Sequence, residues 1–129
     1  MYLVDTSVLI DFLKGSDTPQ SKKFESILEN KIPFGISAFT YQEVLQGAKD
    51  TKEYDKLNNY LSTQKIYYPS NKSYEKAAKL FFTCRKSGIT IRSTIDTLIA
   101  TSAIENNLIL LHNDRDFDKM AEVADMRME

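Results

Sequence analysis

The sequence has few of the residues that mark several specialised classes of protein. Its 129 residues include a single cysteine, so no disulfide can form within the chain, and a reducing compartment is expected. No apolar run approaches the roughly 18 residues that a membrane-spanning helix needs. The opening segment MYLVD lacks a basic region and reaches a carboxylate early, which is unlike a secretory signal. These absences predict a cytoplasmic protein without membrane contact.

No charge of one sign dominates the chain. Seventeen basic and eighteen acidic side chains give a net charge of −1, which excludes a protein coated with cations for binding phosphate all over its surface. A local basic patch remains compatible with this balance. Only four glycines and three prolines are present and 42% of the residues are hydrophobic, which excludes a chain that is mostly disordered. The length predicts a single domain that spans residues 1–129.

Short apolar runs alternate with segments of helical periodicity along the whole chain. The runs predict strands at 2–4, 33–36, 66–68 and 108–111. The helices are expected at 8–14, around 24–28, at 38–46, 54–61, 74–82 and 95–103. The helix at 74–82 is expected to bury a wide apolar stripe of Tyr74, Ala77, Ala78, Phe81 and Phe82. Apolar strands between helices are typical of a parallel sheet covered on both faces, so the fold class is α/β.

Acidic residues stand at the points where this α/β pattern places functional sites. Asp5 closes the first predicted strand, and Asp114 and Asp116 directly follow the last one. Glu43 lies two turns into the helix after the second strand, and Asp96 lies in the first turn of the helix before the last strand. Ligands of open parallel sheets bind beyond the carboxyl ends of the strands. We therefore expect these carboxylates to converge.

Carboxylates that converge need a cation between them. Two like charges about 4 Å apart repel by about 4 kcal/mol at an effective dielectric constant near 20. Mg²⁺ and Mn²⁺ prefer oxygen ligands, and carboxylates with water supply them. Zinc fits poorly, because the chain has one histidine and one cysteine far apart. An all-carboxylate magnesium site suits the hydrolysis of phosphodiesters.

Each of these acids also has a structural interpretation. Asp5 and Asp116 stand where caps and helix starts are common, so either could serve a turn instead of a site. Asp96 follows Ser93 by three residues, as the acid of a capping box does, and Glu43 follows Thr40 in the same way. Their joint position at the strand ends favours a shared site over four separate caps.

Four segments carry a resemblance to a known family. They are VDTSVLID at 4–11, SAFTYQEVLQG at 37–47, IDTLIA at 95–100 and LHNDRDF at 111–117. In this order and at these spacings they resemble the four motifs of PIN-domain ribonucleases, above all the VapC-type toxins of bacterial and archaeal toxin–antitoxin pairs. The resemblance extends from residue 3 to residue 117 and implies a three-layer α/β/α sandwich around a mainly parallel sheet.

The resemblance also implies the composition of the active site. The catalytic and metal-binding acids would be Asp5, Glu43, Asp96 and Asp114, with Asp116 as a possible fifth metal ligand. Asp5 and Asp96 would hold Mg²⁺ or Mn²⁺ most directly, and Thr6 or Ser7 would support Asp5 by hydrogen bonding. The family usually has a small residue such as threonine where His112 stands, so we expect a structural or surface role for this histidine.

A metal-dependent endoribonuclease follows from the resemblance, with RNA as the substrate and inhibition of translation as the outcome. The same resemblance implies a cognate antitoxin as partner and a homodimer as the assembly. Arg92 is a candidate for contact with a phosphate, because a guanidinium matches phosphate oxygens. A PIN nuclease that is no toxin, or a catalytically silent PIN module that binds RNA or protein, is the alternative. A phosphoacceptor domain is disfavoured, because no aspartate follows the strand at 66–68.

Overall fold

A single parallel sheet runs through the middle of the molecule. The computed structural model describes residues 1–129, and its five strands lie in the order β3-β2-β1-β4-β5 with every neighbouring pair parallel. The bounds of the strands are β1 Tyr2–Val4, β2 Phe34–Ser37, β3 Lys65–Tyr67, β4 Ile109–Leu111 and β5 Arg127–Met128. The first strand in the sequence is therefore the central strand of the sheet, between β2 and β4. The chain reverses its direction of winding at this point, which is where parallel sheets place their ligands.

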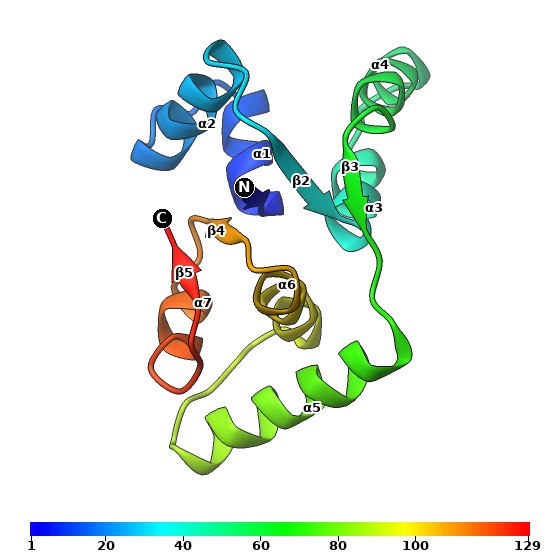
Figure 1. Ribbon diagram of the computed structural model, residues 1–129. Helices are drawn as coiled ribbons and strands as arrows, with labels where there is room; N and C mark the ends of the chain where they lie inside the picture. The colour runs from blue at the N-terminus through cyan, green and yellow to red at the C-terminus, as the bar shows by residue number, and fades with distance from the viewer.

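Helices cover both faces of the sheet (Figure 1). Their bounds are α1 Thr6–Leu13, α2 Pro19–Glu29, α3 Ala38–Gln46, α4 Thr51–Leu61, α5 Asn71–Lys86, α6 Thr94–Glu105 and α7 Arg115–Met120. Alternate residues of each strand point to opposite faces, so Leu3 and Leu110 pack with α5, α6 and α7, whereas Val4 and Leu111 pack with α1, α2 and α3. The result is the three-layer α/β/α arrangement that the sequence predicts.

The predicted elements are present, with corrections at their edges. The third strand begins and ends one residue earlier than predicted, and the last helix starts at Arg115 with Asp114 as its N-cap, not at Asp116. Strand β5 has no counterpart among the predicted elements, because its two residues lie in a polar tail and gain their pairing only from β4. No helix combines the length and the apolar character that crossing a membrane requires.

The buried face of α5 differs from the predicted stripe. The helix buries Ser73, Ala77, Leu80 and Cys84, so Ala77 of the predicted stripe is confirmed as core, and Phe81 is partly buried against it. Phe82 is 43% exposed and Tyr74 is 52% exposed. The helix packs mainly against α6, on the outside of the sheet (Figure 1), and a narrow strip of mostly small side chains makes this contact. Tyr74 and Phe82 therefore remain at the surface.

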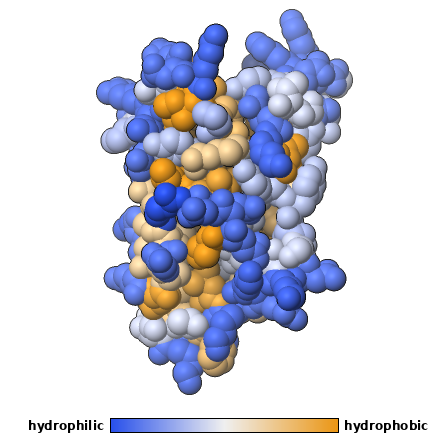
Figure 2. Space-filling view, in the orientation of Figure 1, coloured by the Kyte–Doolittle hydropathy of each residue, from blue (hydrophilic) through white to orange (hydrophobic).

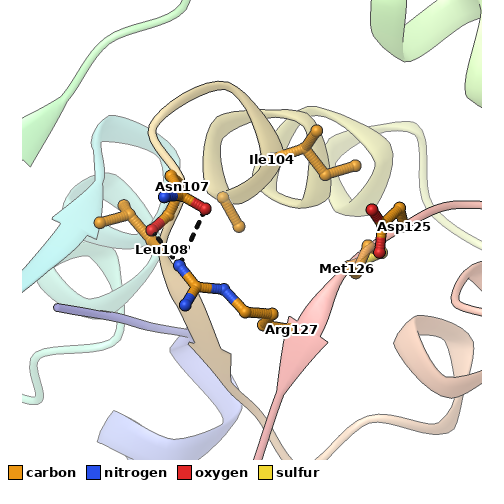
Figure 3. A pocket seen from close by; sticks show the side chains of 7 residues that line it. Ile104, Asn107, Leu108, Asp125, Met126 and Arg127 are labelled. Atoms are coloured by element: carbon orange, nitrogen blue, oxygen red, sulfur yellow. Dashed lines mark hydrogen bonds between the residues drawn. The ribbon is translucent and has the colours of Figure 1, made fainter.

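A small pocket of about 130 Å³ lies beside β5, between the end of α6 and the start of β4. Arg127 closes one side of it, and its Nη2 donates to the backbone oxygen (2.6 Å) and the side-chain Oδ1 (2.9 Å) of Asn107 (Figure 3). Asn107 precedes β4, so this pocket lies toward the amino end of that strand, whereas the acidic residues follow its carboxyl end. The pocket therefore anchors the edge strand and stands apart from the acidic site.

Hydrophilic side chains cover most of the periphery, and apolar surface appears between them in separate patches (Figure 2). The apolar side chains with the largest exposure include Tyr68, Tyr74 and Leu13. Phe24 is buried in the core, but Tyr54 and Tyr60 are each 43% exposed and are not part of it. Solvent thus reaches most of the aromatic side chains of α4 and α5.

Candidate active site

Asp5 stands at the carboxyl end of β1 and caps α1. Its side chain is 5% exposed. Oδ2 accepts hydrogen bonds from the backbone N–H of Ser7 at 3.1 Å and from the Ser7 hydroxyl at 2.6 Å. Burial raises the pKa of this carboxyl above its ordinary value, while the bonds from Ser7 act in the opposite direction. Asp5 is therefore both a cap and a buried acid that faces the other carboxylates.

Thr6 connects the first strand end to Glu43. Its hydroxyl lies 3.0 Å from Oε1 of Glu43 and 3.1 Å from the hydroxyl of Thr40. The sequence predicts that Thr6 or Ser7 supports Asp5. The Ser7 hydroxyl contacts Asp5, whereas the Thr6 hydroxyl binds Glu43 and only the backbone of Thr6 acts to lower the pKa of Asp5. Helix α3 begins at Ala38 with Ser37 as its N-cap, so Thr40 and Glu43 do not form a capping box. They lie three residues apart on one helix face, which turns Glu43 toward the site.

Asp114 follows β4 and is bound from two sides. It caps α7 by accepting from the N–H of Asp116 at 3.0 Å, and the same oxygen accepts from Nη2 of Arg92 at 3.1 Å. The loop before it is tied to α1, because the N–H of Asn113 donates to the Ser7 hydroxyl oxygen at 3.0 Å. The Ser7 hydroxyl therefore contacts both Asp5 and the loop that carries Asp114.

Asp116 is engaged by Arg92. Its Oδ2 accepts from the backbone N–H of Arg92 at 3.0 Å and from Nε at 3.2 Å. The Asp116 side chain is 1% exposed, and its Oδ1 has no hydrogen-bond partner, with Lys119 Nζ 3.8 Å away. Burial acts to raise the pKa of Asp116, but the hydrogen bonds and the positive charges of Arg92 and Lys119 outweigh it, so the pKa is lowered.

Asp96 has no such partner. The N-cap Ser93 makes no side-chain capping bond, so the capping-box interpretation of Ser93 and Asp96 is wrong. The half-buried carboxyl of Asp96 forms no hydrogen bond with the protein. Burial, followed by the negative charges of Asp5, Asp114, Asp116 and Glu43, raises its pKa to about 7. The five predicted acids therefore share one electrostatic environment, in which Asp96 is the least compensated.

His112 is buried behind the site. Its Nδ1 accepts from the N–H of Asp114 at 3.2 Å, its Nε2 lies 3.5 Å from Asp118, and its ring is 5.1 Å from the ring of Phe117. A ring held on three sides shapes the loop that carries Asp114. The geometry agrees with the structural role expected for this residue, in a buried position and not at the surface.

The family model of the PIN domain matches residues 2–123 of the chain. The chain belongs to the PIN-domain family. This PIN domain is 25% identical over 129 residues to a VapC ribonuclease of Mycobacterium bovis, with 98% of this chain and 96% of the relative covered. Ribonuclease VapC11 of Mycobacterium tuberculosis has the same identity and coverage.

Solved structures share the fold. A toxin–antitoxin complex from Klebsiella pneumoniae contains a chain with 28% identity and a TM-score of 0.71, with 91% of this chain and 90% of that chain covered. The VapBC2 complex of Rickettsia felis, bound to a promoter DNA fragment, superposes with a TM-score of 0.77 at 22% identity and covers 99% of this chain and 96% of that one. At 22% identity, the similarity to the Rickettsia felis complex shows the fold alone.

The donor set of this PIN domain suits a hard divalent cation. Four carboxylates act electrostatically on Asp96, and the only histidine is turned toward Asp118 and the loop. The unpartnered Asp96, with its pKa raised to about 7 by burial and by neighbouring negative charges, is the group that a cation would relieve. No three acidic, histidine or cysteine side chains are arranged as a ready-made ion site. The chemistry of the donors therefore fits Mg²⁺ or Mn²⁺, and binding would have to draw the carboxylates together.

Two residues of this arrangement are absent from the set that the sequence predicts. Thr40 contacts Thr6 in the interior, and Asn113 connects the β4 loop to α1 through Ser7 and through a 3.0 Å bond from Nδ2 to Asp11. The spacing of Thr40 and Glu43 in the sequence is the signal that could have indicated Thr40. Nothing in the sequence near Asn113 indicates contact with residues more than 100 positions away.

Proposed function

We propose that this PIN domain is a metal-dependent endoribonuclease and the toxin of a toxin–antitoxin pair. The observation that carries the proposal is the cluster of carboxylates at the carboxyl ends of β1 and β4, beside the point where the sheet reverses its winding. The raised pKa of Asp96 supports it, because four further carboxylates are close enough to repel this group. The ribonuclease relatives and the toxin–antitoxin complexes support the same conclusion.

Asp5 and Asp96 would hold the cation directly, and Glu43 and Asp114 would complete its surroundings. When bound, Mg²⁺ or Mn²⁺ supplies a Lewis acid that activates water and neutralises charge on the phosphate. The protein supplies orientation: Ser7 fixes Oδ2 of Asp5, and Thr6 fixes Oε1 of Glu43. Asp116 would act behind these residues, because Arg92 already occupies its Oδ2.

Arg92 would stand at the border between the acids and the substrate. Its side chain is 68% exposed, although two of its nitrogens contact Asp114 and Asp116. The remaining N–H groups of the guanidinium are free to donate to a phosphate oxygen. Such a contact would place a phosphodiester next to the carboxylates.

The partners follow the same proposal. A groove of about 590 Å³ lies between the end of α1 and α4, with Leu13, Leu57 and Tyr60 among charged side chains in its wall. This apolar strip with a charged rim suits an amphipathic segment of an antitoxin. The homodimer and the cytoplasmic location belong to the proposal as expectations from the family.

The test is cleavage of a mixed pool of transfer and ribosomal RNA by protein freed of any copurified partner. Cleavage at discrete sites is expected with Mg²⁺ or Mn²⁺ and none with EDTA. Asp5→Asn should abolish it, whereas Asp55→Asn, which removes an exposed carboxylate from α4, should leave it unchanged. Folded protein that cleaves nothing with either metal would contradict the proposal and favour the silent binding module.

A further inference from the structure

Helix α5 concentrates positive charge in a molecule that is otherwise acidic. Its 16 residues carry five lysines and arginines and one acid, which gives a charge of +4, whereas the whole chain has −1. Of the five cations only Lys76 forms an ion pair, with Glu105 at 3.2 Å. The other four, which are exposed and unpaired, are Lys72, Lys79, Arg85 and Lys86. The exposed helix α4 has two basic and two acidic residues and no net charge.

An aromatic ring stands among the cations at the end of α5. Phe82 is 43% exposed, and Lys79 Nζ, Lys86 Nζ and Arg85 Cζ lie 5.3, 5.6 and 5.8 Å from the centre of its ring. The three cations are three or four residues from Phe82 along the helix, so they share its face. We call Lys79, Phe82, Arg85 and Lys86 the α5 patch. Cations around an exposed aromatic ring are the combination that binds single-stranded nucleic acid, by phosphate contact and by base stacking.

The α5 patch is close to the acids along the chain. Lys86 and Arg92 are six residues apart, so the loop between them spans at most roughly 20 Å. Arg92 contacts Asp114 and Asp116, and Asp96 begins the helix that follows. A nucleic acid strand held on the patch therefore needs only a few nucleotides to reach the carboxylates.

We infer that the α5 patch is an accessory RNA-binding surface, which holds single-stranded RNA beside the acidic site. The inference rests on the proposed nuclease function for the choice of RNA and on charge complementarity for the surface itself. Without a bound cation the acidic site repels a polyanion, and a separate cationic surface would help to keep the substrate close. Phe82 would stack with a base, and the three cations would neutralise the flanking phosphates.

The test measures binding of a fluorescein-labelled 20-nucleotide single-stranded RNA of mixed sequence by anisotropy, in EDTA so that no cleavage occurs. The triple variant Lys79→Gln, Arg85→Gln, Lys86→Gln should bind at least tenfold more weakly at low salt. Each lost phosphate contact should lower the slope of log K against log salt by about 0.7. The matched control Lys49→Gln, Lys52→Gln, Lys56→Gln removes the same charge around α4 and should keep most of the affinity and the slope.

The ring is tested separately. Phe82→Leu should weaken RNA binding about tenfold by removing the stacking surface, whereas Phe82→Tyr keeps a ring and should bind RNA as tightly as the wild type. Equal affinity of the α5 triple variant and the α4 control would overturn the inference, as would tighter binding of phosphatidylserine vesicles or polyglutamate than of RNA. Failure of the proposed function would instead appear as wild-type protein that binds RNA through the patch and cleaves none with metal.

Discussion

Asp96 at the start of α6 and Asp116 at the start of α7 belong to one acidic cluster, and their surroundings push them in opposite directions. Asp116 is the more deeply buried, yet its pKa is lowered because Arg92 and Lys119 offset the burial. Asp96 is only half-buried, yet its pKa rises to about 7 because burial and four neighbouring acids act on it without a compensating donor. The presence of partners, more than the depth of burial, therefore decides what a carboxylate does here.

This difference assigns Asp116 a role in stability and Asp96 a role in the chemistry of the site. Asp116 joins the loop before α6 to the start of α7, and its negative charge strengthens the hydrogen bonds that stabilise this contact. Asp96 keeps its charge only at a cost to the folded state, a cost that a cation would remove. Functional groups are often those whose surroundings oppose their ionisation. Substitutions at the two acids should therefore separate effects on activity from effects on stability.

The largest expected effect is on catalysis by Asp96→Asn. The rate of RNA cleavage should fall by about 100-fold or more, because a metal ligand stabilises the transition state by several kcal/mol. The metal-free variant should nevertheless be at least as stable at pH 8 as the wild type, since the amide carries no charge. Cleavage assays and urea unfolding in EDTA measure the two effects. A variant that loses activity and stability together would make Asp96 a structural acid.

A smaller effect, on stability, is expected for Asp116→Ala. The loss of the carboxylate leaves the N–H of Arg92 without its acceptor, so the melting temperature should drop by about 5–10 °C. The control is Lys22→Gln, which removes an exposed ion pair with Asp17 and should shift the melting temperature by less than about 2 °C. Thermal unfolding followed by circular dichroism reports both. Equal shifts would show that the bonds between Arg92 and Asp116 add little to the fold.

The third expected effect is a pH dependence of stability. The pKa of Asp96 is near 7 in the folded protein and near 3.8 when unfolded, so the folded state binds more protons between these values. In EDTA the stability of wild type relative to Asp96→Asn should therefore fall as the pH rises from about 4 to 7, and then level off. Asp116, with its lowered pKa, contributes above its unfolded value and loses that contribution in acid. Urea midpoints across pH 3–9 test this; a difference that rises with pH would refute it.

The features that depend on local patterns could be predicted from the sequence. The apolar runs that form β1 and β4 lie in line with the acids that follow them, so the pattern alone places Asp5 and Asp114 at one sheet edge. The contact between Arg92 and Asp116 could not be predicted, because it joins the loop before α6 to the first turn of α7, 24 residues further along the chain. The apolar stripe of α5 was predicted too wide, because helical spacing alone does not show which side of the stripe faces α6 and leaves Tyr74 and Phe82 exposed.

The Ser7 hydroxyl connects the start of α1 with the loop after β4. It donates its only hydrogen to Asp5 and accepts from the N–H of Asn113, so it has no freedom to rotate without breaking one of these bonds. A threonine could keep both contacts, whereas an alanine would uncouple the start of α1 from the loop after β4. A displacement of α1 would therefore be transmitted through this one hydroxyl to the loop that carries Asp114.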